Sequence, residues 1–190
     1  MFESKFFSRL AALSLLFSVT GLSAECAINP GFEGLNTAVK GFPVPATSPV
    51  QGVERLGIAQ VEALRNDDRY VLVDVRPPAY FQACRIKGSQ NFEYTFAGPE
   101  GEKLYKTEKR LNKSILEGWT NQGKTVVLFC NNAFGKKGCH RAANAAITAV
   151  CSWNLPGDRI KWFAEGVSGT APKYPDLVEG ELCQPPWHRK

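Results

Sequence analysis

The chain has 190 residues, a net charge of +5 and a hydrophobic content of 44%. This length is sufficient for one domain with a complete core. The mildly basic balance suits small anionic substrates, and it is too small to indicate nucleic-acid binding.

The first residues are typical of a secretory signal peptide. Lys5 and Arg9 precede or border an apolar run at 10–19, and small residues follow up to Ala24. The run is too short for a comfortable membrane span. We expect cleavage after Ala24 and a periplasmic or secreted product with no membrane span. Cleavage removes two basic residues and one acidic residue, so the net charge falls from +5 to +4.

Residues 25–52 are rich in proline and glycine and show no sustained period, so we expect an extended arm on the domain or trailing from it. Regular structure is expected from near Ile58, within a domain at 53–175. The spacing of Ile58, Val61 and Leu64 predicts a helix. Residues 70–75 form an apolar run that predicts a buried strand, which Pro77 and Pro78 stop.

The later elements continue the alternation of strands and helices. We expect a turn at 80–83, a small strand at 90–92, a surface excursion at 96–109, a helix at 110–119, a buried strand at 126–129, an alanine-rich helix at 142–150, a strand at 159–163, a loop at 166–169 and an outer tail at 176–190. This order predicts an α/β domain with a mostly parallel central sheet flanked by helices.

Cys130 directly follows the buried strand at 126–129 and precedes the alanine-rich helix. A thiol in this place lies at the carboxyl edge of the sheet, where backbone N–H groups and a helix N-terminus favour an anion. Lys136, Lys137 and Arg141 are cations that would lower the thiol pKa from about 8.5 and could bind an anionic substrate. The alternative is a buried, unreactive cysteine at the strand end.

The cysteines are expected to form disulfides, because an exported chain meets oxidising conditions. Connectivity cannot be read from the sequence. We expect a Cys26–Cys183 pair, since both residues lie in irregular segments that would need to be tied down. The chain has two histidines and no close CxxC pair, so we expect no metal site.

Four segments in this order resemble the rhodanese family. They are Val73-Asp74-Val75-Arg76, the segment 80–91 (YFQACRIKGSQN), Leu128-Phe129-Cys130, and Trp162-Phe163-Ala164-Glu165-Gly166. The resemblance implies a rhodanese-like fold and a sulfurtransferase without a cofactor. Cys130 would take a sulfur atom from a small anionic donor such as thiosulfate and hold it as a persulfide. The acceptor would be cyanide or a thiol, and this thiol could belong to a protein.

The chain departs from the family pattern in two places, the loop after Cys130 and the segment 80–91. Ten residues separate Cys130 from Arg141, where the family usually has about four, and Cys84 and Arg85 replace the usual glycine and histidine. The longer loop adds Cys139, which could be a resolving thiol, the nucleophile, half of a disulfide or an unreactive residue.

The alternatives to sulfur transfer are a thiol–disulfide or persulfide relay through Cys130 and Cys139, or a non-catalytic module that binds a partner. We interpret Asp74 and Arg76 as a structural pair rather than as catalysts. A phosphatase would need a short cysteine–arginine loop, which the ten-residue gap argues against.

Overall fold

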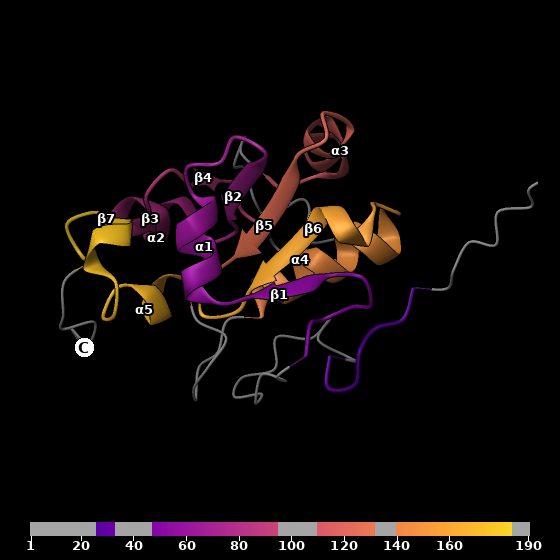
Figure 1. The fold of residues 1–190 in the computed structure, drawn as a ribbon, viewed down its shortest axis with the longest axis horizontal. Helices are drawn as coiled ribbons and strands as arrows, with labels where there is room; N and C mark the ends of the chain where they lie inside the picture. The colour runs from indigo at the N-terminus through magenta and orange to yellow at the C-terminus, as the bar shows by residue number, and fades with distance from the viewer. Residues whose placement is uncertain (1–25, 33–46, 95–109, 132–139, 184–190) are drawn as a thin grey trace, which may run out of the picture.

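The computed structural model describes residues 26–32, 47–94, 110–131 and 140–183 (Figure 1). The expected signal peptide, the excursion at 96–109, and the candidate residues Lys136, Lys137 and Cys139 lie outside these ranges. Within them, no helix combines the length and apolar character needed to cross a membrane.

The centre of the fold is a sheet of five parallel strands. They are β1 (Glu54–Leu56), β2 (Tyr70–Asp74), β4 (Gln90–Asn91), β5 (Thr125–Phe129) and β6 (Ile160–Phe163), in the order β1-β6-β5-β2-β4. The predicted α/β class with a parallel sheet is therefore confirmed. The sequence prediction missed β1 because this strand has three residues and two of them, Glu54 and Arg55, are charged.

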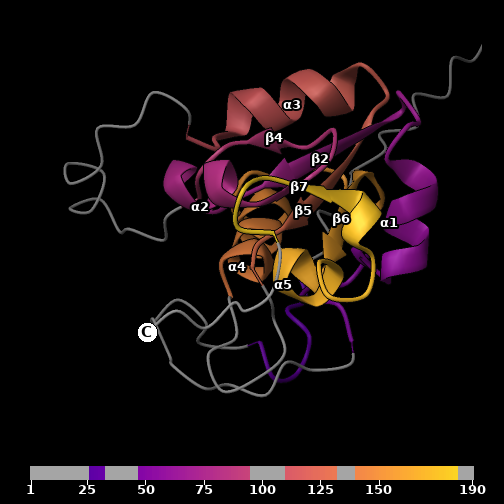
Figure 2. The same ribbon diagram turned by 90° about the vertical axis from the view of Figure 1, so that its left-hand side faces the viewer.

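Helices cover both faces of the sheet (Figures 1 and 2). On one face lie α3 (Lys113–Asn121) and α4 (Arg141–Ile147), and on the other lie α1 (Ile58–Leu64) and α5 (Gly166–Thr170). The central strand β5 contributes Val126 and Leu128 to the first face, and Val127 and Phe129 to the second. All its residues are buried, as its unbroken apolar run predicts.

Short elements complete the chain. They are α2 (Pro78–Ala83), β3 (Arg85–Ile86), η2 (Thr148–Ser152, a π-helical turn), η3 (Gly157–Arg159), η4 (Pro175–Leu177) and β7 (Val178–Glu179). The turn expected at 80–83 is part of α2, which begins at Pro78 because proline is tolerated in the first turn of a helix.

Two expectations about the C-terminal part are wrong. The loop predicted at 166–169 is the helix α5, whose glycines lower its intrinsic propensity but whose Val167 is fully buried. The described part of the predicted outer tail includes β7, which pairs antiparallel with β3. Leu177 and Val178 are buried there, so this segment belongs to the core.

The disulfides differ from the predicted pair. Cys26 is bonded to Cys151, and Cys183 is bonded to Cys84, so the Cys26–Cys183 prediction is wrong. The reason is that the two segments pack on opposite faces of the sheet. Cys151 borders the cluster that contains the arm residue Phe32, whereas Cys84 and Cys183 belong to the other cluster.

We expect the Cys26→Ser/Cys151→Ser double variant to lose about 2–4 kcal/mol of unfolding free energy, because the cross-link constrains the unfolded chain over a separation of 125 residues. Cys26 is exposed, so little packing is lost with its sulfur. Urea unfolding without reductant, compared with the wild type, measures the difference. An unchanged midpoint and slope would contradict this expectation.

Candidate active site at the carboxyl end of the sheet

The carboxyl ends of three neighbouring strands meet beside Cys130. Asp74 at the end of β2 and Phe163 at the end of β6 are both register partners of Phe129, the last residue of β5. Cys130 follows Phe129 directly and is 3% exposed. The strand-end position predicted for this cysteine is therefore present in the fold, at the edge where open α/β sheets bind ligands.

Cys130 is disulfide-bonded in this structure, and no described cysteine is a free thiol. A disulfide sulfur is not a nucleophile, because only the thiolate attacks an electrophilic sulfur. The structure therefore represents an oxidised form of the site. Reduction must come before any reaction that begins with a Cys130 thiolate.

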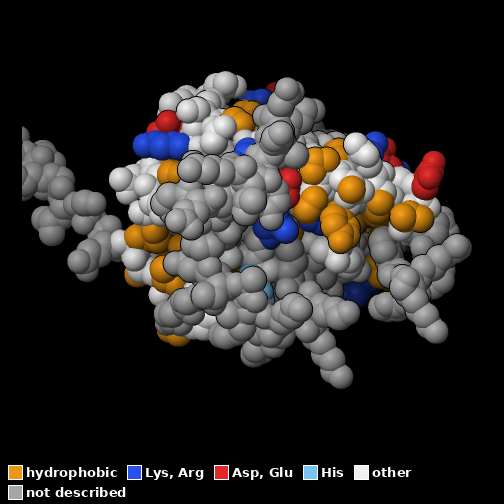
Figure 3. All heavy atoms as spheres, turned by 180° about the vertical axis from the view of Figure 1, so that it is seen from behind, with side chains coloured by type: hydrophobic (Ala, Val, Ile, Leu, Met, Phe, Trp, Pro, Cys, Tyr) orange, Lys and Arg blue, Asp and Glu red, His pale blue; other side chains and the backbone are white. Residues whose placement is uncertain are grey.

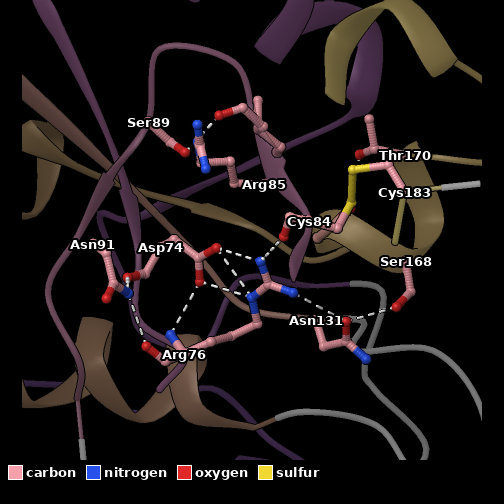
Figure 4. A network of polar contacts seen from close by, with 12 residues as sticks. Asp74, Arg76, Cys84, Arg85, Ser89, Asn91, Asn131, Ser168, Thr170 and Cys183 are labelled. Carbon is pink, nitrogen blue, oxygen red and sulfur yellow. Dashed lines mark hydrogen bonds and ion pairs between the residues drawn. A yellow bond between two sulfur atoms is a disulfide. The ribbon is translucent and has the colours of Figure 1, made fainter. Parts of the chain in front are cut away.

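A buried ion pair lies next to this edge (Figure 4). Arg76 Nε donates to Asp74 Oδ1 at 2.9 Å and Arg76 Nη2 donates to Oδ2 at 2.6 Å, with both side chains nearly fully buried. Arg76 Nη2 also donates to the carbonyl of Cys84. These contacts agree with the interpretation of Asp74 and Arg76 as a structural pair.

The pKa of Asp74 is under two opposed influences. Burial raises it, and the hydrogen bonds and charge of Arg76 oppose that rise. The carboxylate can remain ionised in this buried place because a bidentate guanidinium faces it. The removal of Arg76 would leave an unpaired buried charge, which is strongly destabilising.

The first turn of α5 holds the chain just after β5. The Val167 N–H donates to the Cys130 carbonyl at 3.0 Å, and the Ser168 N–H donates to the Asn131 carbonyl at 2.7 Å. Gly166 allows this approach, because it has φ +55° and an added Cβ would lie 2.5 Å from the Asn131 carbonyl oxygen. Sequence reasoning did not single out Asn131 or Ser168, since isolated polar residues carry no periodic signal.

Arg141 is the first residue of α4, and its side chain contacts protein groups. Its Nη1 donates to the Tyr94 carbonyl at 2.9 Å and lies 3.5 Å from Glu93 Oε1. The Glu93 carboxylate therefore neutralises part of the positive charge of Arg141. The anion-binding role expected for Arg141 stays a prediction.

His140 precedes α4 at its N-cap position. Burial lowers its pKa below the ordinary value of 6.5. The neutral imidazole is consequently the favoured form in the folded protein near neutral pH.

The face opposite to that of Figure 1 shows how charge is distributed over the described surface (Figure 3). Lys and Arg side chains lie there in separate groups, and apolar side chains gather beside one of them.

Among the described residues, no group of three or more His, Cys, Asp or Glu side chains is arranged to hold a metal ion.

Comparison with known proteins places these features in a family. Residues 58–167, more than half of the chain, match the rhodanese-like domain. A search of curated proteins found no match.

Solved structures are similar in fold. Ygr203w of Saccharomyces cerevisiae, a homolog of single-domain rhodanese and the Cdc25 phosphatase catalytic domain, is 19% identical, with 68% of this chain and 88% of that chain covered and a TM-score of 0.50. The As-Sb reductase of Leishmania major is 18% identical, with coverages of 68% and 87% and a TM-score of 0.47. At 19% identity the likeness to Ygr203w concerns the fold alone.

We expect Gly166→Ala to lower the free energy of unfolding by at least about 2 kcal/mol, because it combines a positive φ with a backbone clash. The matched control is Gly118→Ala in α3, where an added Cβ meets nothing within 4 Å. That variant should gain about 0.5–1 kcal/mol. Urea unfolding measures both, and similar behaviour of the two variants would contradict the assigned role of Gly166.

We expect the protein to lose stability as pH falls from about 7.5 to about 5, in part through His140. Its folded pKa is lowered, so the unfolded state takes up the proton first and stability is lost as pH falls towards the folded pKa. The loss of melting temperature should be smaller in His140→Gln. Melting temperatures measured across this pH range test the expectation, and a loss in His140→Gln equal to that of the wild type would contradict it.

Proposed function

We propose that this protein, which belongs to the rhodanese-like domain family, is a sulfurtransferase whose Cys130 thiolate accepts a sulfane sulfur from a small anionic donor such as thiosulfate. The observation that carries the proposal is the position of Cys130. It directly follows the central strand β5, at the edge where three parallel strands end. This is where the family resemblance expects the nucleophile.

The proposed reaction has two displacements. The Cys130 thiolate attacks the outer sulfur of thiosulfate, the sulfur–sulfur bond of the donor breaks, and sulfite leaves with the bonding electron pair. An acceptor thiolate or cyanide then attacks the outer sulfur of the persulfide and releases the Cys130 thiolate. In this scheme Lys136, Lys137 and Arg141 bind the donor through its negative charge.

A thiol–disulfide relay is a second candidate, and the oxidised state of Cys130 favours it. The chain has six cysteines, and four of them form the Cys26–Cys151 and Cys84–Cys183 bonds. We propose Cys139, the remaining cysteine of the sequence, as the partner of Cys130. A reducing dithiol would open this disulfide and become oxidised itself, so that electrons balance.

The two candidates can also be successive steps of one cycle. If Cys139 attacks the inner sulfur of a Cys130 persulfide, a disulfide forms and hydrosulfide leaves. An external dithiol must then reduce the disulfide before Cys130 can accept sulfur again. In this cycle the sulfur leaves as hydrosulfide, and the external dithiol, a small molecule or a protein, acts as the reductant.

We propose that the protein works in an oxidising compartment, as a periplasmic or secreted protein after removal of residues 1–24. The two disulfides between described cysteines support this location, since such bonds persist outside the reducing cytosol. The order of basic, apolar and small residues at the start of the chain supports it as well.

The test is mass spectrometry of the reduced protein after addition of thiosulfate and removal of excess reagent. We expect a gain of one sulfur atom on the Cys130 peptide in the wild type and none in Cys130→Ser. Cys139→Ser should retain the persulfide, because in the proposed cycle Cys139 reacts only after the persulfide has formed on Cys130. The Cys26→Ser/Cys151→Ser variant, in which Cys130 is intact, serves as the matched control.

The same measurement separates the alternatives. A loss of two hydrogens that joins Cys130 to Cys139 in the wild type, together with no sulfur gain in Cys139→Ser, would favour the relay. Sulfur gain in Cys130→Ser but not in Cys139→Ser would show that the nucleophile is Cys139. No reaction of the wild type with any sulfane donor or dithiol would favour a module that only binds a partner.

A further inference from the structure

We propose that Ser168 is a positioning residue for Cys130 and that it acts through the side chain of Asn131. The proposal rests on the proposed function only in taking Cys130 as the reactive cysteine. It concerns a contact between α5 and the first residue after Cys130. Nothing in the family resemblance or in the comparisons assigns a role to either residue.

The contact has two hydrogen bonds, both short. The Ser168 N–H donates to the Asn131 carbonyl at 2.7 Å, and the Ser168 hydroxyl donates to Asn131 Oδ1 at 2.7 Å. Figure 4 shows the two side chains pointing toward each other. Ser168 therefore holds the backbone and the side chain of Asn131 together, so that Asn131 cannot rotate without breaking one of these bonds.

The preceding peptide is fixed from the same side. The Cys130 carbonyl accepts from the Val167 N–H at 3.0 Å. In a planar trans peptide the N–H points opposite to the carbonyl, so the Asn131 N–H is directed away from α5. This N–H is the backbone donor that follows Cys130 in the chain, and backbone donors of this kind stabilise a nearby anion such as a thiolate or persulfide.

A second anchor lies on the other side of Asn131. Arg76 Nη1 is 3.5 Å from Asn131 Oδ1, and Arg76 itself is immobilised by Asp74 and the Cys84 carbonyl. The Ser168 bond to the same oxygen is the shorter of the two, at 2.7 Å against 3.5 Å, and the longer distance is beyond the usual range for a hydrogen bond. We therefore assign the orientation of Asn131 chiefly to Ser168.

Ser168→Ala tests the side-chain bond alone, because the backbone N–H of residue 168 is retained. After reduction, Cys130 is alkylated with iodoacetamide at a series of pH values, and its peptide is quantified by mass spectrometry. We expect the rate near neutral pH to fall about two- to tenfold, the effect of one neutral hydrogen bond, and the apparent pKa of Cys130 to rise.

Two further variants separate positioning from general damage. Ser168→Thr retains the hydroxyl and should restore the wild-type pH profile. Ser89→Ala removes a hydroxyl that donates to the Ile86 carbonyl, away from Asn131, and should leave the profile unchanged. Melting temperatures of all variants, measured in parallel, verify that each is folded under the conditions of alkylation.

A double-mutant cycle tests whether Ser168 acts through Asn131. Asn131→Ala alone should slow alkylation, and the addition of Ser168→Ala should then change nothing more. A Ser168→Ala profile that superimposes on the wild type overturns the proposal. A Ser168→Ala effect that persists undiminished in the Asn131→Ala background overturns it as well.

The outcome is independent of sulfur transfer. If alkylation responds as expected but thiosulfate gives no persulfide, the proposed function fails and the positioning role stands. If persulfide forms at equal rates in the wild type and Ser168→Ala and alkylation is also unchanged, the proposed function stands and the positioning role fails.

Discussion

The buried pair of Asp74 and Arg76 connects the parts of the carboxyl edge to one another. Asp74 ends β2, and Arg76 reaches from it to the Cys84 carbonyl and towards Asn131. The side chain of Asn91 donates to the carbonyls of both residues, so β4 is tied to the same point. A charge buried this deeply is tolerated only where its partner is held in place. Here Arg76 is held by contacts with Asp74, the Cys84 carbonyl and the Asn91 side chain. The placement of Arg76 beside Asn131, the residue that follows Cys130, depends on this pair.

The domain also needs segments that lie outside the region matching the family. Phe32 and Val50 precede residues 58–167 and are buried against the face covered by α3 and α4, where Phe32 packs edge-on against Trp162. Leu177 and Cys183 follow that region and are buried as well. Each flanking segment is fastened by its own disulfide, one on either face of the sheet.

The sequence was most informative where burial is complete. The strands β2 and β5 are buried on both faces, so their apolar runs and their ends could be predicted, and the place of Cys130 followed from them. The short helix α5 could not be predicted, because its glycines and hydroxyl residues have low propensity and packing of Val167 holds it. Disulfide partners depend on which face each segment covers, and the contact of Ser168 with Asn131 depends on the left-handed turn at Gly166. Neither the disulfide pairing nor this contact produces a periodic pattern in the sequence.

The pairing of β1 with β6 has a consequence for biogenesis. Glu54 pairs with Lys161, so a strand near the start of the domain lies against the last strand of the central sheet, and Cys26 joins Cys151 across a similar stretch. Synthesis delivers the N-terminal strand first, and its partner follows more than a hundred residues later. Until then the edge of β1 that pairs with β6 is open to pairing with other chains, and pairing over such a distance is intrinsically slow. The nascent chain is therefore exposed to intermolecular strand pairing until β6 has been synthesised.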